Sequence, residues 1–157
     1  MTRRLNLAAL LRQHREIGAA IQSFIAKLEA GGMQTELVTA MLDALRQHIY
    51  LEEVFLFPPL RDAGIMMPIV VMTREHGQLW ETMENLSQLL DDPADGPPLE
   101  AMCDRLLGQL RAHSFNEEPA IYLHANYDLP ASTSAELTRF VATGRLPEGW
   151  KCRQAKS

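Results

Sequence analysis

The 157-residue chain has few cysteines and few basic side chains. Its two cysteines, Cys103 and Cys152, show no CxxC spacing, which supports neither a disulfide scaffold nor a zinc–thiolate site. We interpret them as unrelated thiols, with Cys152 in an exposed tail. The 15 Lys and Arg residues are scattered among 20 Asp and Glu residues, so no phosphate-binding face and no nucleic-acid partner are predicted.

The sequence also lacks long apolar runs. No stretch reaches the roughly 18 residues needed to span a bilayer. Arg3 and Arg4 lead directly into a periodic segment without the apolar core of a signal peptide. We therefore expect a cytoplasmic protein with no membrane partner. Hydrophobic residues make up 46% of the chain, which is enough to form the core of one ordinary domain.

Apolar residues recur at helical spacing along most of the chain, and strand signals are essentially absent. Proline and glycine mark the limits of the helical segments. The predicted helices run from the N-cap Asn6 to Gly31–Gly32, from Thr35 to the Pro58–Pro59 pair, from Pro68 to residues 91–96, and from Pro97–Pro98 through Ile121.

Four long helices with short connections predict an all-α fold, an antiparallel up-down-up-down four-helix bundle. Thr133 and Glu136 form a capping-box pattern, and Gly144 follows as a stop signal, which predicts a short C-terminal helix. The remaining tail, with Leu146 and Trp150, is expected to pack on the bundle. All of these elements belong to one predicted domain over residues 1–157.

One constellation of polar residues occurs twice: a lone histidine and, well downstream, His-x-x-x-Glu-Glu followed by apolar and aromatic residues. The first copy is His14 with residues 48–53, and the second is His76 with residues 113–118. The interval between the lone histidines nearly equals that between the paired ones, so one helical hairpin is predicted to occur twice. Each half offers two imidazoles and one carboxylate, which predicts a metal pair between the halves.

Each histidine of the constellation lies on the apolar stripe of its predicted helix and therefore points inward. A glutamate four residues after a histidine is offset by about 40° around the helix and rises about 6 Å, so the two side chains share a face. Glu52 and Glu117 meet this condition. Glu53 and Glu118 lie about 140° away, and we assign them to solvent or to contacts outside the ligand set.

Inward imidazoles and carboxylates each cost free energy on the kcal/mol scale if they are unpaired, and di-metal sites in helix bundles use these side chains. A set without thiolates favours iron, manganese or zinc over copper, magnesium or calcium. Two bridging glutamates, two histidines on each ion and an oxo or hydroxo bridge leave about one open position per metal for a small molecule. The predicted ligands are His14, His48, Glu52, His76, His113 and Glu117.

Three further polar residues lie within or close to the two motifs: Tyr50, Tyr122 and His124. His124 is on the ligand face but beyond Pro119, and we favour a structural role for it over ligation. Tyr50 and Tyr122 are placed to donate hydrogen bonds to a bound oxo or peroxide group, although core packing is the preferred interpretation of both. The metal-binding core is thus expected at about residues 6–125, with the short helix and tail at 126–157.

At these residues the chain resembles the hemerythrin-like family, whose domain is named for its His-His-Glu pattern, over about residues 10 to 125. The resemblance implies a four-helix bundle with a non-haem di-iron centre at the six positions, bridged by the two glutamates. Oxygen-carrying hemerythrins have a histidine where this chain has Trp80, and an aspartate five residues after the histidine equivalent to His113. The layout is more similar to that of di-iron proteins that repair iron–sulfur clusters, whose additional cysteine-bearing domain is missing here.

We therefore expect a cytoplasmic di-iron protein that binds or senses a small diatomic or peroxide ligand: dioxygen, nitric oxide or peroxide. Manganese or zinc would be the substitutes for iron. A second hypothesis is an enzyme or iron donor on the same site, with peroxidase-like, ferroxidase-like or cluster-repair activity. A third is a metal-free interaction module in which the inward histidines and glutamates pair with one another. The sequence leaves the choice between sensor and enzyme open, and it identifies no protein partner.

Overall fold

The computed structural model describes residues 2–30, 35–91, 96–122, 135–136, 139–140 and 144–155. Within the first and last long helices, the side chains of residues 2–11, 13, 14, 28 and 96–98 are outside this description. The described residues contain helices and no strands, so the prediction of an all-α bundle is confirmed. None of the described helices is both long and apolar enough to cross a membrane.

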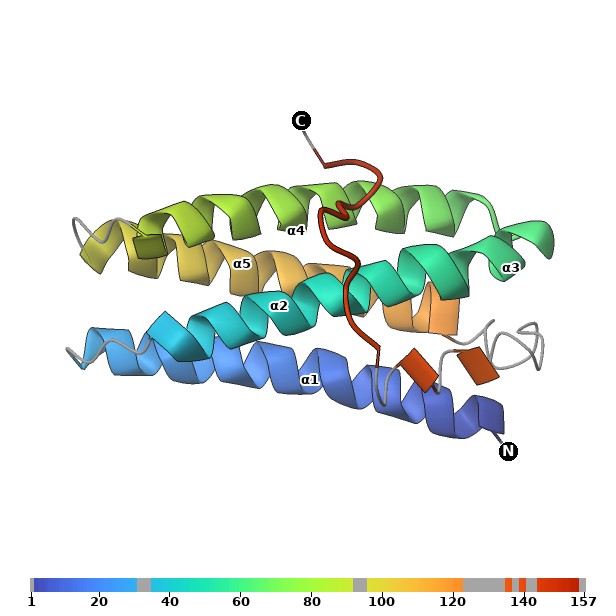
Figure 1. The fold of residues 1–157 in the computed structure, drawn as a ribbon, viewed down its shortest axis with the longest axis horizontal. Coiled ribbons are helices and arrows are strands. Elements are labelled where there is room, and N and C mark those ends of the chain that lie inside the picture. The colour runs from blue at the N-terminus through green and yellow to red at the C-terminus, as the bar shows by residue number, and fades with distance from the viewer. Residues whose placement is uncertain are drawn as a thin grey trace.

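Four long helices lie side by side along the length of the molecule, each packed against two of the others (Figure 1). Helix α1 packs against α2 and α5, and α4 packs against the same two helices. Two π turns, η1 and η2, extend α2 and α5, and the short helix α3 follows η1. Their bounds are α1 Thr2–Glu29, α2 Thr35–Leu51, η1 Glu52–Leu56, α3 Phe57–Asp62, α4 Met67–Asp91, α5 Gly96–Glu117 and η2 Glu118–Tyr122.

The starts of the helices follow the sequence signals in three cases out of four, including α2, which begins at Thr35 as predicted. Pro68 lies in the first turn of α4, and Pro97 and Pro98 lie in that of α5, where a missing N–H removes no helical hydrogen bond. The prediction of Asn6 as an N-cap is wrong, because α1 begins at Thr2 and Asn6 is inside it. The Arg-Arg-Leu segment before Asn6 has good helix propensity, which allows this earlier start.

The prediction that Pro58–Pro59 ends the second helix is also wrong. The chain continues from α2 through η1 into α3, and the Phe57 N–H donates to the carbonyl oxygen of Glu52, five residues back. This wider turn places both prolines in the first turn of α3, where they need donate no N–H. The helical stretch ends only at Asp62, and Gly64 adopts a φ of 100° in the turn that follows.

A second π turn follows the second motif in the same way. Segment η2 begins at Glu118, directly after Glu117, and contains Pro119, where the sequence predicts a distortion. A π turn inserts an extra residue and so changes which side chains after it face the bundle interior. Both glutamate-bearing helices therefore change register at the place where their polar ligand-type side chains lie.

The buried apolar side chains form two clusters, separated along α4 and α5 by polar residues. The larger cluster is made by α1, α2, most of α4 and α5, and includes Phe24, Leu45, Met83 and Leu106. The smaller cluster is made by η1, α3, the start of α4 and η2. On α4 the change occurs at His76, and along α5 and η2 it occurs between Leu110 and Ile121. A polar layer is thus enclosed between two buried apolar regions.

The C-terminal tail, residues 144–155, crosses the outside of the bundle over α2 and α4 (Figure 1). Trp150 packs edge-on against Tyr50 and Trp80, with ring centroids 5.0 and 5.5 Å apart, which confirms that the tail packs on the bundle. At Gly77 the tail approaches so closely that a Cβ atom would lie 2.7 Å from the Cβ of Gln154. A glycine is therefore needed at this contact.

Two predictions about the C-terminal region have different outcomes. Cys152 is buried in the larger cluster with 3% of its surface exposed, so the prediction of an exposed thiol is wrong. Burial raises the pKa of this thiol to about 12, which makes the reactive thiolate scarce. Of the predicted fifth helix, residues 135–136 and 139–140 are helical, while Thr133 lies outside the described residues.

Candidate metal centre

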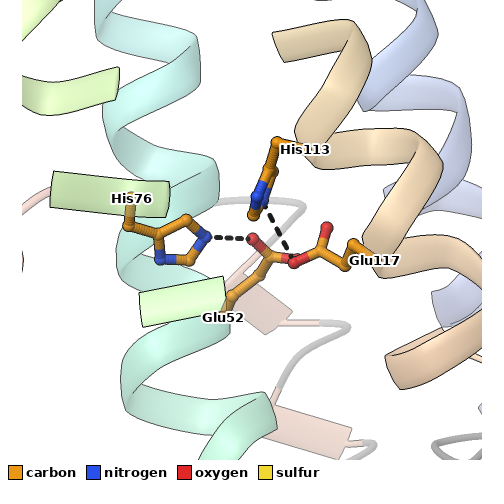
Figure 2. Close-up of side chains that lie close together, drawn as sticks. All are labelled: Glu52, His76, His113 and Glu117. Atoms are coloured by element: carbon orange, nitrogen blue, oxygen red, sulfur yellow. Dashed lines mark hydrogen bonds and ion pairs between the residues drawn. The ribbon is translucent and has the colours of Figure 1, made fainter. Parts of the chain in front are cut away.

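Four polar side chains meet in the interior of the bundle between the two apolar clusters. Figure 2 shows Glu52, His76, His113 and Glu117 facing one another from η1, α4 and α5. One ligand-type atom from each lies within 4.8 Å of the others. Exposed fractions of these residues run from 0 to 2%, so the set is withdrawn from bulk water. Such a group of oxygen and nitrogen donors is of a size and chemistry that suits a metal ion.

The i+4 relation between histidine and glutamate holds in both motifs. His113 Nε2 lies 3.3 Å from Glu117 Oε2, and His48 Nε2 lies 3.5 Å from Glu52 Oε2. His48 is 1% exposed and joins the same buried group. The helical register predicted from the sequence thus brings five of the six predicted ligands together. Their role as ligands stays a prediction.

Two of the predicted positions fall outside what the structure describes. His14 lies in α1, but its side chain is not among the described ones. His124 follows η2 and lies outside the described residues. The site as described therefore has three histidines and two glutamates.

His76 has a carboxylate at both ring nitrogens. Its Nδ1 lies 2.7 Å from Glu53 Oε2, and its Nε2 lies 3.1 Å from Glu52 Oε1. A neutral imidazole has one N–H and one lone pair, so it can donate to only one of these two acceptors. The second contact therefore requires a further proton, on the ring or on a carboxylate, or a cation between Nε2 and the inner carboxylate. The sequence-based assignment of Glu53 to a contact outside the ligand set agrees with this geometry.

His113 repeats this arrangement with a different outer partner. Its Nδ1 lies 2.8 Å from Glu75 Oε1, and Asn116 Nδ2 donates to Glu75 Oε2 over 3.1 Å. Metal-binding histidines commonly donate their second ring N–H to a carboxylate, which fixes the tautomer and makes the ligand nitrogen more basic. Sequence reasoning missed Glu75 because it considered only the inward stripe. The available signal was an acidic residue directly before His76.

The carboxylates change the pKa values of both histidines. Burial alone would lower the pKa of His113, but the charge of Glu117 and hydrogen bonds to Glu117 and Glu75 outweigh it and raise the pKa to about 10. Burial would also lower the pKa of His76, but the hydrogen bonds to Glu52 and Glu53 together with the charge of Glu52 raise it. The hydrogen bond from His113 lowers the pKa of Glu75. The site therefore attracts positive charge strongly, whether as protons or as metal.

Tyr122 contributes a hydroxyl group to the same layer. It donates to Glu52 Oε2 over 2.9 Å, and its oxygen lies 3.2 Å from His48 Nε2. Burial, followed by the charges of Glu117 and Glu52, raises its pKa well above the usual value, so it remains a hydrogen-bond donor. The preferred interpretation of core packing is confirmed for Tyr122, which belongs to the smaller apolar cluster, and its hydrogen bond to Glu52 is an additional contact. The ring of Tyr50 packs among aromatic neighbours.

The helical bundle and its buried carboxylate and imidazole donors define a protein with a candidate metal centre. Residues 5–123 match the family model described as the hemerythrin HHE cation binding domain. The matched region covers most of the chain and all six predicted ligand positions, so this chain belongs to that family. No match was found among curated proteins or among solved structures.

Proposed function

We propose that this protein binds two iron ions in the polar layer and that the pair binds or senses dioxygen, nitric oxide or peroxide. The observation that carries the proposal is the arrangement at His76 and His113. Each ring has its Nδ1 against an outer carboxylate and its Nε2 turned toward an inner carboxylate. That arrangement suits nitrogen ligands held ready for a cation, and family membership adds independent support for cation binding.

The donor set fits an iron pair in number and in kind. Glu52 and Glu117 approach from facing helices, and their carboxylates are the candidates to bridge two ions. His48, His76 and His113, with His14 from α1, would be the terminal ligands. Iron held by these residues would supply redox chemistry and the affinity for a small ligand.

The chain's own residues would orient that site and keep it dry. Glu53 and Glu75 fix the rings of His76 and His113 through their Nδ1 atoms. Tyr122 holds the second oxygen of Glu52. The apolar clusters on both sides exclude water, which strengthens every electrostatic contact in the layer.

Burial also limits the size of the molecule that can bind. The inner donors are at most 2% exposed, so a large substrate has no contact with them in this conformation. A diatomic gas or peroxide needs only small fluctuations of the surrounding side chains to enter. This restriction favours a small oxidant over a metabolite as the bound species.

The direct test is a titration of anaerobic, iron-loaded protein with nitric oxide, followed by optical and electron paramagnetic resonance spectra. Saturation at a fixed number of molecules per chain, without continued consumption, is the expected result. The same protein given peroxide should show no sustained turnover. Multiple turnovers of peroxide would instead favour the enzyme hypothesis, and an absence of any spectral change with either ligand would contradict small-oxidant binding.

A further inference from the structure

Two adjoining cavities lie beneath the C-terminal tail, beside α3 and the first turns of α4. Their volumes are about 360 and 220 Å³, and they share Arg61, Thr73 and Arg153. We call them together the tail pocket. The larger cavity is lined by Arg61, Ile69, Val70, Thr73, Arg153 and Gln154.

The tail pocket has a strong excess of positive charge. Arg61 and Arg153 line both cavities, and Lys151 lines the smaller one. No carboxylate is among the residues that line the larger cavity. In the part of the chain that the structure describes, neither guanidinium forms an ion pair or a side-chain hydrogen bond. Two arginines that line one cavity without an acidic partner favour an anion there.

Glu53 is the acidic residue in the lining of the smaller cavity, and its charge is already engaged. One of its oxygens lies 2.7 Å from His76 Nδ1, and the other accepts the backbone N–H of Arg153 over 3.0 Å. Glu53 therefore faces the polar layer and the tail backbone, and it leaves both arginine side chains to the cavity. Glu53 thus lines the tail pocket and also contacts His76 of the candidate metal centre.

The walls of the larger cavity are partly apolar. Ile69 is 1% exposed and belongs to the smaller apolar cluster, while Val70 beside it is 57% exposed. The exposed fraction of Val70 shows that an apolar surface remains uncovered next to two guanidinium groups. A ligand with an oxyanion head and a short carbon chain would match both features.

We propose that the tail pocket binds a small organic oxyanion, its head group between Arg61 and Arg153 and its carbon part against Ile69 and Val70. A guanidinium can donate two parallel N–H bonds to one carboxylate or phosphate, which selects this head group over chloride. Because Arg153 also donates its backbone N–H to Glu53, the ligand would contact a tail residue that holds an outer partner of His76.

Isothermal titration calorimetry of the full metal-loaded chain, repeated on metal-free protein, tests this inference without measuring activity at the metal. The probes are hexanoate, acetate and inorganic phosphate. We expect one saturable site per chain and tighter binding of hexanoate than of acetate. Tighter binding of phosphate with the same dependence on both arginines would identify a phosphate head group instead.

Arg61→Gln and Arg153→Gln should each weaken binding at least about tenfold, since each removes charge-assisted hydrogen bonds. Arg153→Gln keeps the backbone N–H to Glu53, so it isolates the role of the guanidinium. The lysine variants R61K and R153K, which keep the charge but lose the paired donors, should weaken binding less. Melting temperatures report whether each variant is folded.

Arg105→Gln is the matched control, because Arg105 is exposed on α5 and lines neither cavity. It should bind the probes like the unmodified chain. Wild-type affinity in both pocket variants, an equal loss in R105Q, or no saturable binding of any probe would overturn the proposal. Its failure would leave the iron proposal untouched, since the titration does not depend on metal.

Discussion

The two His-x-x-x-Glu-Glu motifs form similar inner contacts but are supported by different neighbours. In both, the histidine ring lies 3.3–3.5 Å from the glutamate four residues later, and a π turn begins at that glutamate in the first motif and directly after it in the second. The outer carboxylates differ. Glu53, from the first motif, lies against His76, whereas Glu118, at the same place in the second motif, lines a surface cavity beside Arg15. His113 takes its outer partner, Glu75, from α4 instead.

The residue five positions after each inner glutamate also differs between the motifs. After Glu52 it is Phe57, whose ring stacks on His76 with centroids 5.6 Å apart and an interplanar angle of 12°. After Glu117 it is Tyr122, whose hydroxyl donates to Glu52. The repeated spacing therefore determines the inner histidine–glutamate contacts. The outer carboxylates and the aromatic neighbours differ between the two halves. Each half also depends on a group from the other half: Glu53 of the first contacts His76 of the second, and Tyr122 of the second donates to Glu52 of the first.

The largest effects are expected from removing the inner carboxylates. Glu52→Ala and Glu117→Ala should each lose most of the bound iron, because each removes a proposed bridge and leaves neighbouring histidines without a buried partner. Iron per chain after desalting measures this. Glu118→Ala is the control and should retain iron, since Glu118 is not among the inner donors. If E118A lost as much iron as E117A, the assigned helical register would be wrong.

Removal of the outer carboxylates should have intermediate effects. Glu53→Ala and Glu75→Ala should each weaken iron affinity about 10- to 100-fold, because His76 and His113 lose the groups that orient their rings. Competition with a calibrated chelator gives the affinities, and Glu16→Ala, exposed on α1, is the control. Unchanged affinity in both variants would contradict the role given to the outer carboxylates.

Substitutions at two tyrosines separate the effect of a buried hydrogen bond from that of ring packing. Tyr122→Phe should lower the free energy of unfolding of the metal-free protein by about 1.5–3 kcal/mol, because a buried carboxylate loses a hydrogen bond. Tyr50→Phe is the matched control, because the Tyr50 ring packs against Phe140 and Trp150 and its hydroxyl makes no hydrogen bond among the described residues. Denaturant melts of the two variants should therefore differ, and equal melts would assign Tyr122 to packing alone.

The most gradual effect is the pH dependence of the metal-free protein. The folded pKa of His113 is raised to about 10 and that of His76 is raised too, so the folded state binds more protons than the unfolded one above about pH 6.5. Their stabilising effect is complete below about pH 6.5 and is lost as pH rises toward 10. Melts of chelated protein across this range should show falling stability, and a rise would contradict the raised pKa values.

Local sequence signals were sufficient for the helices and for the inner glutamates. Helical period placed His48 and Glu52 on one face, and the structure shows them in contact. The same period could not identify Glu75, because its contact with His113 depends on how α4 packs against α5. The prediction that the helix ends at Pro58–Pro59 was wrong because a π turn lets the helical stretch continue past both prolines. Contacts within one helix and the meeting of the inward side chains were predictable, whereas the outer contact between Glu75 and His113 was not.

The metal content of the protein tests the central claim most directly. Protein loaded with iron without air, then desalted, should contain about two iron ions per chain by elemental analysis. It should also melt at a higher temperature than the chelated form, because a metal that binds only the folded state stabilises it. An iron content near zero, or a single zinc ion with identical melting of both forms, would contradict the di-iron account and favour a metal-free network of histidines and glutamates.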